Sequence, residues 1–444
     1  TIAAVATPTG RGGVGIVRVS GPLAARIAKN VLGHSPKPRQ AEYLAFKNSS
    51  QQTIDQGIAL YFPAPHSFTG EDVLELQGHG GPVVMDMLLN TVIEAGARLA
   101  RSGEFSERAF LNDKLDLTQA EAIADLIDAS SEQAARSAMR SLQGAFSDVV
   151  YKLVEQVTQL RIFVEASIDF PEEEIDYISE GKVSSQIEAQ LQTLATITSQ
   201  AQQGSLIREG INLVLVGRPN AGKSSLLNTL AQREAAIVTE VPGTTRDIVK
   251  EAIMLDGLPI HLLDTAGLRP SEDQVEKEGM RRTWEAVSQA DVMLLLVDNA
   301  VGFGEQEQAI LQQCPKQVAV IVGFNKCDLS AAKNTAPIEP TQGHQCHISA
   351  KTGKGMDILI DQIKGLAGMQ SSGEGAFMAR RRHLVALDQA QTHLQFALQQ
   401  AQQQQGELIA EELKLVQQSL GEISGELSSD DLLGKIFSEF CIGK

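Results

Sequence analysis

The sequence lacks the features that mark secreted and membrane-bound proteins. Its four cysteines, at positions 314, 327, 346 and 441, form no C-x-x-C pair and no disulfide framework, which fits a reducing compartment. None of its apolar runs reaches the roughly 20 residues that a membrane-spanning helix needs. The N-terminus has no basic segment followed by an apolar core, so we expect no signal peptide. These absences predict a cytoplasmic protein with no membrane partner.

Positive charge is also scarce. The chain has 38 lysines and arginines against 55 aspartates and glutamates, which gives a net charge of −17. This balance argues against a protein that coats nucleic acid by bulk electrostatics, although a local basic patch would still allow binding. The densest patch is Arg380–His383, and the solvated start of a helix explains it equally well. The cluster His344–His347 has no second half, which favours a polar loop over a metal site.

The N-terminal part of the chain, residues 1–112, alternates short apolar runs with turn signals. This pattern is typical of a compact α+β domain. We expect strands at 14–20, 57–62 and 72–77, a loop at 78–81, and helices at 82–95 and 104–112. His79, a lone histidine in the expected loop, is more typical of a structural residue than of a catalytic one.

Two later stretches of the chain have the pattern of helices. In the first, apolar residues from Ala135 to Val164 recur at spacings of three and four, which predicts one long helix ending before Pro171. In the second, the same pattern runs from Ile409 to Ile423. Because neither stripe can bury itself alone, we expect the two stretches to pack together as one helical-bundle domain.

Between the helical stretches lies a glycine-rich segment, Gly217–Ser224, that fits the phosphate-loop pattern G-x-x-x-x-G-K-[ST]. The apolar run Ile211–Val216 before it predicts a buried strand, and Ser225–Leu230 after it predicts the start of a helix. Glycines let backbone N–H groups face the phosphates, and the helix N-terminus adds a positive dipole end. Lys223 would bind the β- and γ-phosphates, and the Ser224 hydroxyl would bind Mg²⁺.

Four further segments complete a GTP site. Asp264–Gly267 follows a strand and offers an acid near Mg²⁺ and a backbone N–H to the γ-phosphate. The aspartate of Asn325–Asp328 can accept two hydrogen bonds from guanine that adenine cannot supply. Ser349–Lys351 would contact the base through its backbone. Gly243–Asp247 is a candidate switch whose Thr245 would reach Mg²⁺.

The usual parts of the hydrolysis machinery are missing. Ras-like GTPases orient the attacking water with a glutamine just after the D-x-x-G motif, and that position is Leu268 here. The water must be held by another group, and the acidic candidates downstream are Glu272, Asp273, Glu276 and Glu278. No arginine finger is evident either, although Arg246 and Arg269 are possible substitutes.

A multidomain chain follows from these patterns, with an α/β P-loop domain inserted into the helical one. The expected divisions are an N-terminal domain at 1–112, a first helical segment at 113–208, a Ras-like G domain at 209–370 and a second helical segment at 371–444. The chain ends in Cys441–Lys444, where a thiol and an amine could serve as nucleophile or ligand. By itself, that pattern favours a frayed terminus.

The chain resembles the MnmE family (also called TrmE), the tRNA-modification GTPases of bacteria, over nearly its entire length. The matching segments are Gly10–Gly15, Gly103–Asn112, Gly243–Asp247 and the terminal Cys-Ile-Gly-Lys. The resemblance implies a homodimer held by N-terminal domains that bind a tetrahydrofolate derivative, in the 5-formyl or 5,10-methylene form. It also implies an MnmG-like partner that uses FAD and NADH. Together the two proteins would add an aminomethyl-type group to carbon 5 of the wobble uridine of certain tRNAs.

The resemblance also assigns roles to individual residues of this chain. The folate site would consist of Arg18, Glu75, Lys114 and Lys444. The water-orienting acid would be Glu276, and a K⁺ ion held by Asn220, Thr239, Val241 and Thr244 would replace the arginine finger. The GTP site would take in Asn220–Ser225, Thr239, Glu240, Val241, Pro242, Gly243, Thr244, Thr245, Asp264–Gly267, Asn325, Lys326, Asp328 and Ser349–Lys351. Lys444 gives the tail a role, and Cys441 beside it offers a thiol.

Two other interpretations remain open. A GTP-gated ribosome-assembly factor or scaffold would use nucleotide only to control its shape. A one-carbon transferase in the N-terminal domain, timed by the GTPase, is compatible with tRNA modification. Nucleoside analysis of tRNA from cells that lack the protein separates the scaffold from the modification enzyme.

Overall fold

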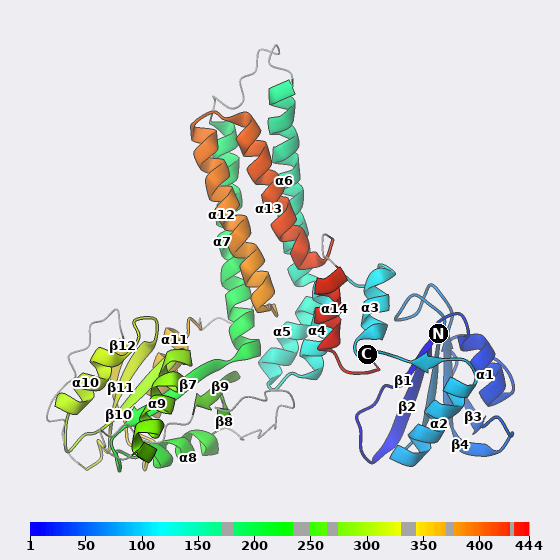
Figure 1. The fold of residues 1–444 in the computed structure, drawn as a ribbon, viewed down its shortest axis with the longest axis horizontal. Coiled ribbons are helices and arrows are strands. Elements are labelled where there is room, and N and C mark those ends of the chain that lie inside the picture. The colour runs from blue at the N-terminus through cyan, green and yellow to red at the C-terminus, as the bar shows by residue number, and fades with distance from the viewer. Residues whose placement is uncertain are drawn as a thin grey trace. The chain divides into compact units, whose positions relative to one another are not determined.

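The computed structural model describes seven stretches of the chain, which fall into two compact units (Figure 1). The described residues are 1–169, 181–233, 249–263, 274–329, 343–369, 377–426 and 430–443. The first unit contains residues 1–124, 141–194 and 386–444, and the second contains 125–140 and 195–385. No described helix is both long and apolar enough to cross a membrane.

The N-terminal part of the first unit is a six-stranded sheet with helices packed on it. Its strands are β1 (Ile2–Val5), β2 (Gly12–Ser20), β3 (Glu42–Lys47), β4 (Thr53–Phe62), β5 (Val73–Gly80) and β6 (Arg98–Leu99), in the order β3-β4-β5-β2-β1-β6. All neighbours are antiparallel except β1 and β6. The helices α1 (Ala24–Leu32) and α2 (Pro82–Glu94) bury Ile27 and Leu88 in the core of the sheet. The predicted α+β domain is confirmed.

Most of the predicted elements of this domain are present, but the loop expected at 78–81 is wrong. Strand β5 continues to Gly80, which pairs with Gly12 of β2. The two strands approach closely here, because a Cβ on Gly80 would lie 2.8 Å from the Gly12 carbonyl oxygen. His79 lies in the strand, and its Nδ1 is 2.8 Å from Asp55 Oδ1. The helix expected at 104–112 is present as α3 (Glu104–Leu111).

The long helix predicted across Ala135 to Val164 is divided in the structure. Helix α5 (Glu132–Leu142) ends before Gly144, and α6 (Ala145–Asp169) begins after it. Gly144 has φ 91°, a left-handed conformation that other residues rarely adopt, and its carbonyl accepts the first hydrogen bond of α6 from Asp148. The apolar stripe continues across this break, so periodicity alone did not reveal it. Pro171 lies outside the described residues.

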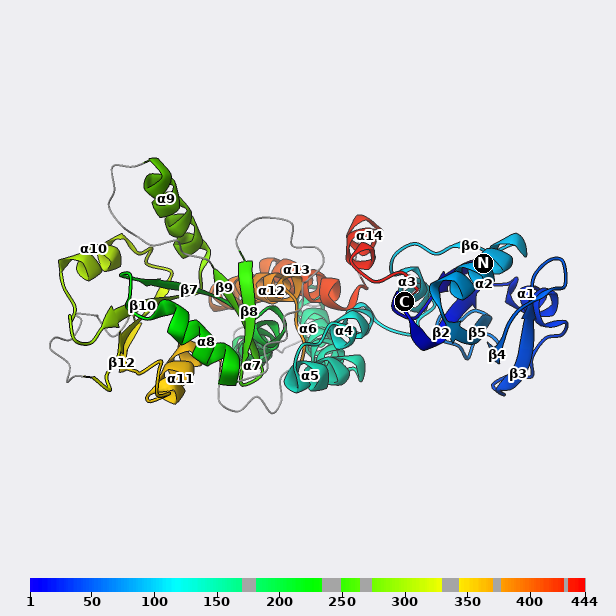
Figure 2. The ribbon, with the colours of Figure 1, turned by 90° about the horizontal axis from the view of Figure 1, so that it is seen from below.

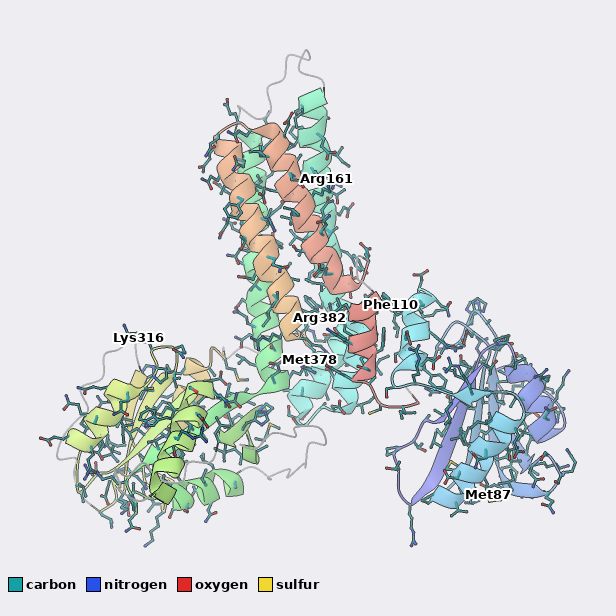
Figure 3. All side chains as sticks on the ribbon, in the orientation of Figure 1. Met87, Phe110, Arg161, Lys316, Met378 and Arg382 are labelled. Carbon is teal, nitrogen blue, oxygen red and sulfur yellow. The ribbon has the colours of Figure 1, made fainter. Side chains whose placement is uncertain are left out.

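The two helical stretches pack together, as predicted. Helix α6 packs along α13 (Gly406–Ser424), with Leu153, Val157 and Leu160 buried on one side and Leu413, Val416 and Leu420 on the other. Arg161, labelled in Figure 3, donates to Gln417 across this contact. The other helices are α4 (Leu117–Ile127), α7 (Lys182–Glu209), α12 (Arg381–Gln402) and α14 (Asp430–Ser438).

The second unit contains another six-stranded sheet, seen from a second direction in Figure 2. Its strands are β7 (Ile211–Gly217), β8 (Val249–Leu255), β9 (Leu258–Leu263), β10 (Val292–Asp298), β11 (Ala319–Asn325) and β12 (Gly343–His347), in the order β12-β11-β10-β7-β9-β8. All neighbours are parallel except β8 and β9. Its helices are α8 (Lys223–Arg233), α9 (Gln274–Gln289), α10 (Glu305–Gln313) and α11 (Met356–Leu366). Apolar cores lie on both faces of this sheet, as in other open α/β domains that bind nucleotides at the strand ends.

The polar loop expected at His344–His347 is instead strand β12. Cys346 points into the core, and burial raises the pKa of its thiol to about 12. His347 stacks on Phe324 with ring centroids 5.0 Å apart. Alternate residues of a strand point to opposite faces, so this cluster cannot converge on one ion. The described part of the chain contains no group of three histidine, cysteine or acidic side chains that could hold a metal ion.

Candidate nucleotide and folate sites

The phosphate loop connects β7 to α8, in the order that the sequence predicts. Lys223 Nζ donates to the carbonyl oxygens of Gly217 at 2.6 Å and Arg218 at 3.1 Å, so the ammonium group is held over the loop. Burial lowers the pKa of Lys223. Asn220 has φ 63°, a left-handed conformation that asparagine tolerates better than most residues. Ser224 is exposed in the first turn of α8, where a ligand can reach it.

Both glycines of the motif occupy positions where a side chain cannot fit. At Gly217, where φ is 154°, a Cβ would lie 2.3 Å from the Leu296 carbonyl oxygen. At Gly222, where φ is 101°, it would lie 2.2 Å from Asn325 Nδ2. The close approach of Asn325 links the phosphate loop to a motif more than 100 residues later in the chain.

Asn325 joins three of the predicted motifs through its side-chain amide. Its Nδ2 donates to the Ala221 carbonyl at 2.8 Å, and its Oδ1 accepts from the Ala350 N–H at 2.9 Å. The residue is 2% exposed, so these bonds form away from water. Thr229 of α8 also donates to the Ala350 carbonyl at 2.6 Å. Hydrogen bonds therefore hold the phosphate loop together with the two loops expected to contact the base, at Asn325 and at Ala350.

Lys326 ties the same loops together from the outside. With φ 66°, it donates from Nζ to the Asn220 carbonyl at 2.8 Å and to Asp298 Oδ2 at 2.7 Å. Sequence reasoning missed Asp298. The sequence feature that could have indicated Asp298 is its position at the end of an apolar run typical of a buried strand. Parallel pairing of that strand with the next sets Asp298 directly beside Asn325.

Asp328 is exposed and is held in its ionised form. A hydrogen bond from Ser349 lowers the pKa of this carboxyl group, and the nearby charges of Lys351 and Lys354 lower it further. An ionised carboxylate at this place accepts hydrogen bonds only, which suits the two donors on the edge of guanine.

Arg218, the first variable residue of the phosphate loop, is held by a residue that sequence reasoning also missed. Its Nη2 lies 2.6 Å from Glu307 Oε2, and its Nε pairs with Oε1 at 2.5 Å. Glu307 is 2% exposed, and its Oε2 also accepts from the Gly304 N–H at 3.0 Å at the start of α10. The buried carboxylate therefore fixes where the phosphate loop begins.

Several predicted GTP-site residues lie outside the described part of the chain. They are Thr239, Glu240, Val241, Pro242, Gly243, Thr244, Thr245, Asp264, Thr265, Ala266 and Gly267. Glu276 lies in the first turn of α9, but its side chain is not described. Of the predicted Mg²⁺ and K⁺ ligands, only Ser224 and Asn220 are described.

A second site of converging side chains lies in the N-terminal domain. Arg18 of β2 and Glu75 of β5 face each other across the sheet, with Arg18 Nε 2.9 Å from Glu75 Oε1. The guanidinium carbon lies 5.7 Å from the ring centre of Phe68 and 5.9 Å from that of Phe105. Phe105 is fully buried, so this arrangement offers a ligand the paired charge and the partly exposed ring of Phe68, which suits a flat ligand that carries carboxylates.

The C-terminal tail reaches the same site, so the frayed terminus favoured by its sequence pattern is wrong for residues 441–443. Ser102 forms an antiparallel bridge with Ile442, and the Gly103 N–H donates to the Cys441 carbonyl at 3.4 Å. Arg18 Nη1 donates to the Gly443 carbonyl at 3.4 Å. Lys444, the next residue, lies outside the described part of the chain. Cys441 is exposed with a free thiol.

Lys114, the remaining predicted folate ligand, follows α3 beside the turn at Gly70. A Cβ on Gly70 would lie 3.2 Å from Lys114 Cε. Asn112 fixes this turn by donating from Nδ2 to the Thr69 carbonyl at 2.7 Å. Thr69 in turn bonds to Ser20 of β2, two residues beyond Arg18, with 2.7 Å between the hydroxyl oxygens.

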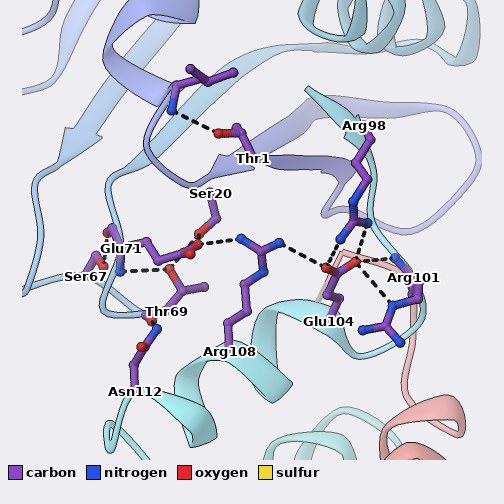
Figure 4. A network of polar contacts seen from close by, with 11 residues as sticks. Thr1, Ser20, Ser67, Thr69, Glu71, Arg98, Arg101, Glu104, Arg108 and Asn112 are labelled. Carbon is purple, nitrogen blue, oxygen red and sulfur yellow. Dashed lines mark hydrogen bonds and ion pairs between the residues drawn. The ribbon is translucent and has the colours of Figure 1, made fainter. Parts of the chain in front are cut away.

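An ion network centred on the buried Glu104 holds the start of the segment from Gly103 to Asn112 (Figure 4). Glu104 receives hydrogen bonds from Arg98, from the Arg101 N–H and from Arg108. Burial favours the neutral acid, but these three donors outweigh it and lower the pKa of Glu104 to about 2. Arg108 also pairs with Glu71 at 2.7 Å. The network anchors α3, which places the ring of Phe105 beside Arg18.

Comparisons with known proteins agree with this architecture. The family model for the GTP-binding protein TrmE N-terminus matches residues 1–114, and that for the MnmE helical domain matches residues 117–441. The tRNA modification GTPase MnmE of Yersinia pestis is 57% identical over 451 residues, covering 100% of this chain and 99% of the relative. The tRNA modification GTPase MnmE of Pectobacterium carotovorum has the same identity and coverage.

Among solved structures, Era of Aquifex aeolicus bound to GDP and aluminium fluoride is 27% identical. It covers 41% of this chain and 66% of its own, with a TM-score of 0.30. The family assignment rests on the two family models and on the full-length relatives. The chain belongs to the MnmE (TrmE) family of tRNA-modification GTPases.

Proposed function

We propose that this protein is a potassium-activated GTPase that hydrolyses GTP to GDP and phosphate in order to modify tRNA. With a folate one-carbon donor and an MnmG-like FAD protein, it installs an aminomethyl or carboxymethylaminomethyl group at carbon 5 of the wobble uridine. The observation that carries the nucleotide part is the Asn325 amide, which bonds to both Ala221 and Ala350. This one residue sets the phosphate loop and the base loops at a fixed separation, as a single nucleotide would require.

The described residues divide the work of binding GTP. The backbone of the phosphate loop and the Lys223 ammonium group hold the phosphates, and Asp328 selects guanine. The exposed Ser224 hydroxyl fits one ligand position of Mg²⁺, together with Thr245. A bound Mg²⁺ would neutralise charge on the β- and γ-phosphates.

Hydrolysis requires a substitute for the glutamine that Leu268 replaces. Glu276, in the first turn of α9, would orient the attacking water. Asn220 would provide one of the K⁺ ligands, with Thr239, Val241 and Thr244. Asn220 has a left-handed backbone and is exposed, so a ligand can reach it. The K⁺ ion would supply the positive charge that an arginine finger supplies elsewhere.

Arg18, Glu75, Lys114 and Lys444 would bind the folate. The Glu75 carboxylate can accept hydrogen bonds from ring N–H groups, and the cations suit the carboxylates of the folate tail. Phe68 is partly exposed and lies close enough to the Arg18 guanidinium to flank a flat ring, whereas Phe105 is fully buried and supports the guanidinium from the core. The homodimer through the N-terminal domains, the cytoplasmic location and a role for the Cys441 thiol are proposed with this site.

The decisive experiment is nucleoside analysis of tRNA from cells that lack the protein. Complementation with the parent chain should restore the modified wobble uridine, and Glu276→Ala should not. Glu276→Ala should still bind GTP but lose hydrolysis. Unchanged wobble uridine in the deletion strain would overturn the proposal in favour of a GTP-gated scaffold. Equal GTPase rates in K⁺ and Na⁺ would refute potassium activation.

A further inference from the structure

The basic patch Arg380–His383 has a different role from the nucleic-acid contact considered from its sequence. Arg380 is 9% exposed and His383 is 2% exposed, so two of the four residues point inward. Arg380 Nη2 donates to Asp125 Oδ1 at 2.9 Å. The His383 Nδ1 accepts from the Arg380 N–H at 3.0 Å, which fixes the start of α12. Figure 3 labels the neighbouring Met378 and Arg382.

Asp125 binds the chain where it enters the nucleotide domain and also where it leaves. Arg208 lies in the last turn of α7, three residues before β7, and its Nε donates to the same Asp125 Oδ1 at 2.9 Å. Arg380 lies directly before α12. The segment that enters the domain also contacts the segment that leaves it, since a Cβ on Gly204 would lie 1.8 Å from the Phe377 carbonyl oxygen. One carboxylate, 7% exposed, therefore clamps both ends of the inserted domain.

The segment that carries Asp125 also touches the nucleotide domain at a second place. Strand β8 begins just after the candidate switch Gly243–Asp247, and β9 ends just before Asp264. The turn between β8 and β9 contains Gly257, whose carbonyl accepts from Ser131 Oγ at 3.2 Å. A Cβ on Gly257 would lie 2.9 Å from Gln133 Oε1, so the turn fits closely against this segment.

Ser131 has a second bond that ties this contact to a helix. Its Oγ accepts from the Ala134 N–H at 3.1 Å, which caps the start of α5. Ala134 and Ala138 of α5 then pack with Ile207, which directly precedes Arg208, and with Met378, two residues before Arg380. A displacement of the β8–β9 turn must therefore either break the Ser131 bond or move the start of α5.

We propose that residues Asp125–Arg140 form a coupling segment that carries the nucleotide state of the switch loops to the helical domain. Ser131 receives the movement of the β8–β9 turn. Asp125, in α4, is a positioning residue that holds the base of the segment still, so that the displacement passes into α5. Helix α5 continues along the chain into the first unit, which resumes at Ser141. The inference rests on the proposed function, in which hydrolysis must act on chemistry elsewhere in the protein.

Ser131→Asp tests this proposal because it separates the two bonds of Ser131. An aspartate still caps α5, but it cannot donate to the Gly257 carbonyl. We expect GTP hydrolysis in K⁺ to stay within about twofold of the parent rate, while wobble-uridine modification falls at least about tenfold, a size typical of allosteric coupling. The matched control is Ser185→Asp, in the exposed first turn of α7, which should change neither activity.

Hydrogen exchange of the full-length protein provides a readout that does not depend on tRNA. In the parent, exchange at residues 132–142 should differ between GDP and GDP with aluminium fluoride, and Ser131→Asp should abolish this difference. A nucleotide-dependent difference that survives in Ser131→Asp, or that is absent in the parent, would overturn the coupling segment. If the parent shows the difference but restores no modified uridine, the proposed function fails and the coupling stands.

Asp125→Asn tests the clamp, with Arg208→Lys as a second variant that keeps the charge. Asparagine preserves the shape but removes the charge that holds two arginines. Where the variants fold, hydrolysis should persist and modification should fall, as for Ser131→Asp. A parallel loss of hydrolysis, modification and thermal stability would mean that Asp125 is only structural and would overturn its positioning role.

Discussion

The two candidate sites of this protein are assembled in opposite ways. The nucleotide site is built around one unbroken stretch, Gly217–Ser224, that carries its own backbone geometry. The candidate folate site gathers Arg18 from β2, Glu75 from β5 and the tail at Gly443, which are joined only by the fold. A contiguous site can be recognised from local pattern, because its chemistry and its shape lie in the same residues. A dispersed site becomes visible only when the strands are placed side by side.

The largest effect is expected from Gly222→Ala, which tests how far the contiguous site depends on its glycine. The new Cβ would lie 2.2 Å from Asn325 Nδ2 and would require φ near 101°. Overpacking and left-handed strain together should weaken GDP binding about 1,000-fold, or about 4 kcal/mol. Calorimetric titration with GDP measures this loss. Gly365→Ala in α11, where a Cβ meets nothing within 4 Å, is the control and should bind normally.

The next effect concerns the ion network that supports the dispersed site. The pKa of Glu104 falls from 4.5 to about 2 in the folded protein. A lowered pKa stabilises the folded state above the unfolded value, and this stability disappears as the pH falls from about 4.5 towards 2. The carboxylate is 3% exposed, so its contribution should approach about 3 kcal/mol.

Urea unfolding at pH 6 and pH 3 tests this contribution. The parent should lose stability between the two values more steeply than Glu104→Gln, which has no group to titrate there. Glu104→Gln should already be weaker at pH 6, because it leaves Arg98 and Arg108 without their shared carboxylate. Equal slopes in the two proteins would show that the network does not stabilise the domain.

Much of the architecture could be predicted from local pattern, and the errors have physical causes. The phosphate loop between its strand and helix, and the pairing of the helical stretches, follow from contiguous motifs and apolar periodicity. The break at Gly144 did not, because the apolar stripe runs through it and only the left-handed backbone shows it. The strand at His344–His347 was missed because its polar residues suggested exposure.

The residues that support the nucleotide site from other elements were missed from the sequence. Asp298 and Glu307 act on the phosphate loop from other elements, and their positions depend on strand order and on the start of α10. Asp125 meets Arg208 and Arg380 only because the chain leaves the inserted domain beside the point where it enters. Such contacts join segments that are distant in sequence, so the local pattern does not show which residues meet.

A smaller effect should follow from Arg18→Ala, which tests whether the two sites bind independently. The substitution removes the pairing with Glu75 and the contact with the tail. Loss of one charge-assisted contact of about 2 kcal/mol should weaken binding of 5-formyltetrahydrofolate about 30-fold. Calorimetry should show unchanged GDP binding in the same protein. Arg26→Ala, an exposed arginine of α1, is the control, and a similar loss there would exclude a specific site at Arg18.

The smallest effect, from Glu307→Gln, asks whether the contiguous site is in fact self-sufficient. Glutamine keeps the shape of the side chain and can still accept from the Gly304 N–H, but the ion pair with Arg218 is lost. The start of the phosphate loop should become less fixed, which should raise KM for GTP about fivefold, or about 1 kcal/mol, with little change in kcat. Glu305→Gln, exposed in the same turn of α10, should leave KM unchanged. An unchanged KM in Glu307→Gln would mean that the loop holds its shape without Arg218. A raised KM would mean that even a site recognised from eight consecutive residues depends on a carboxylate from a distant part of the chain.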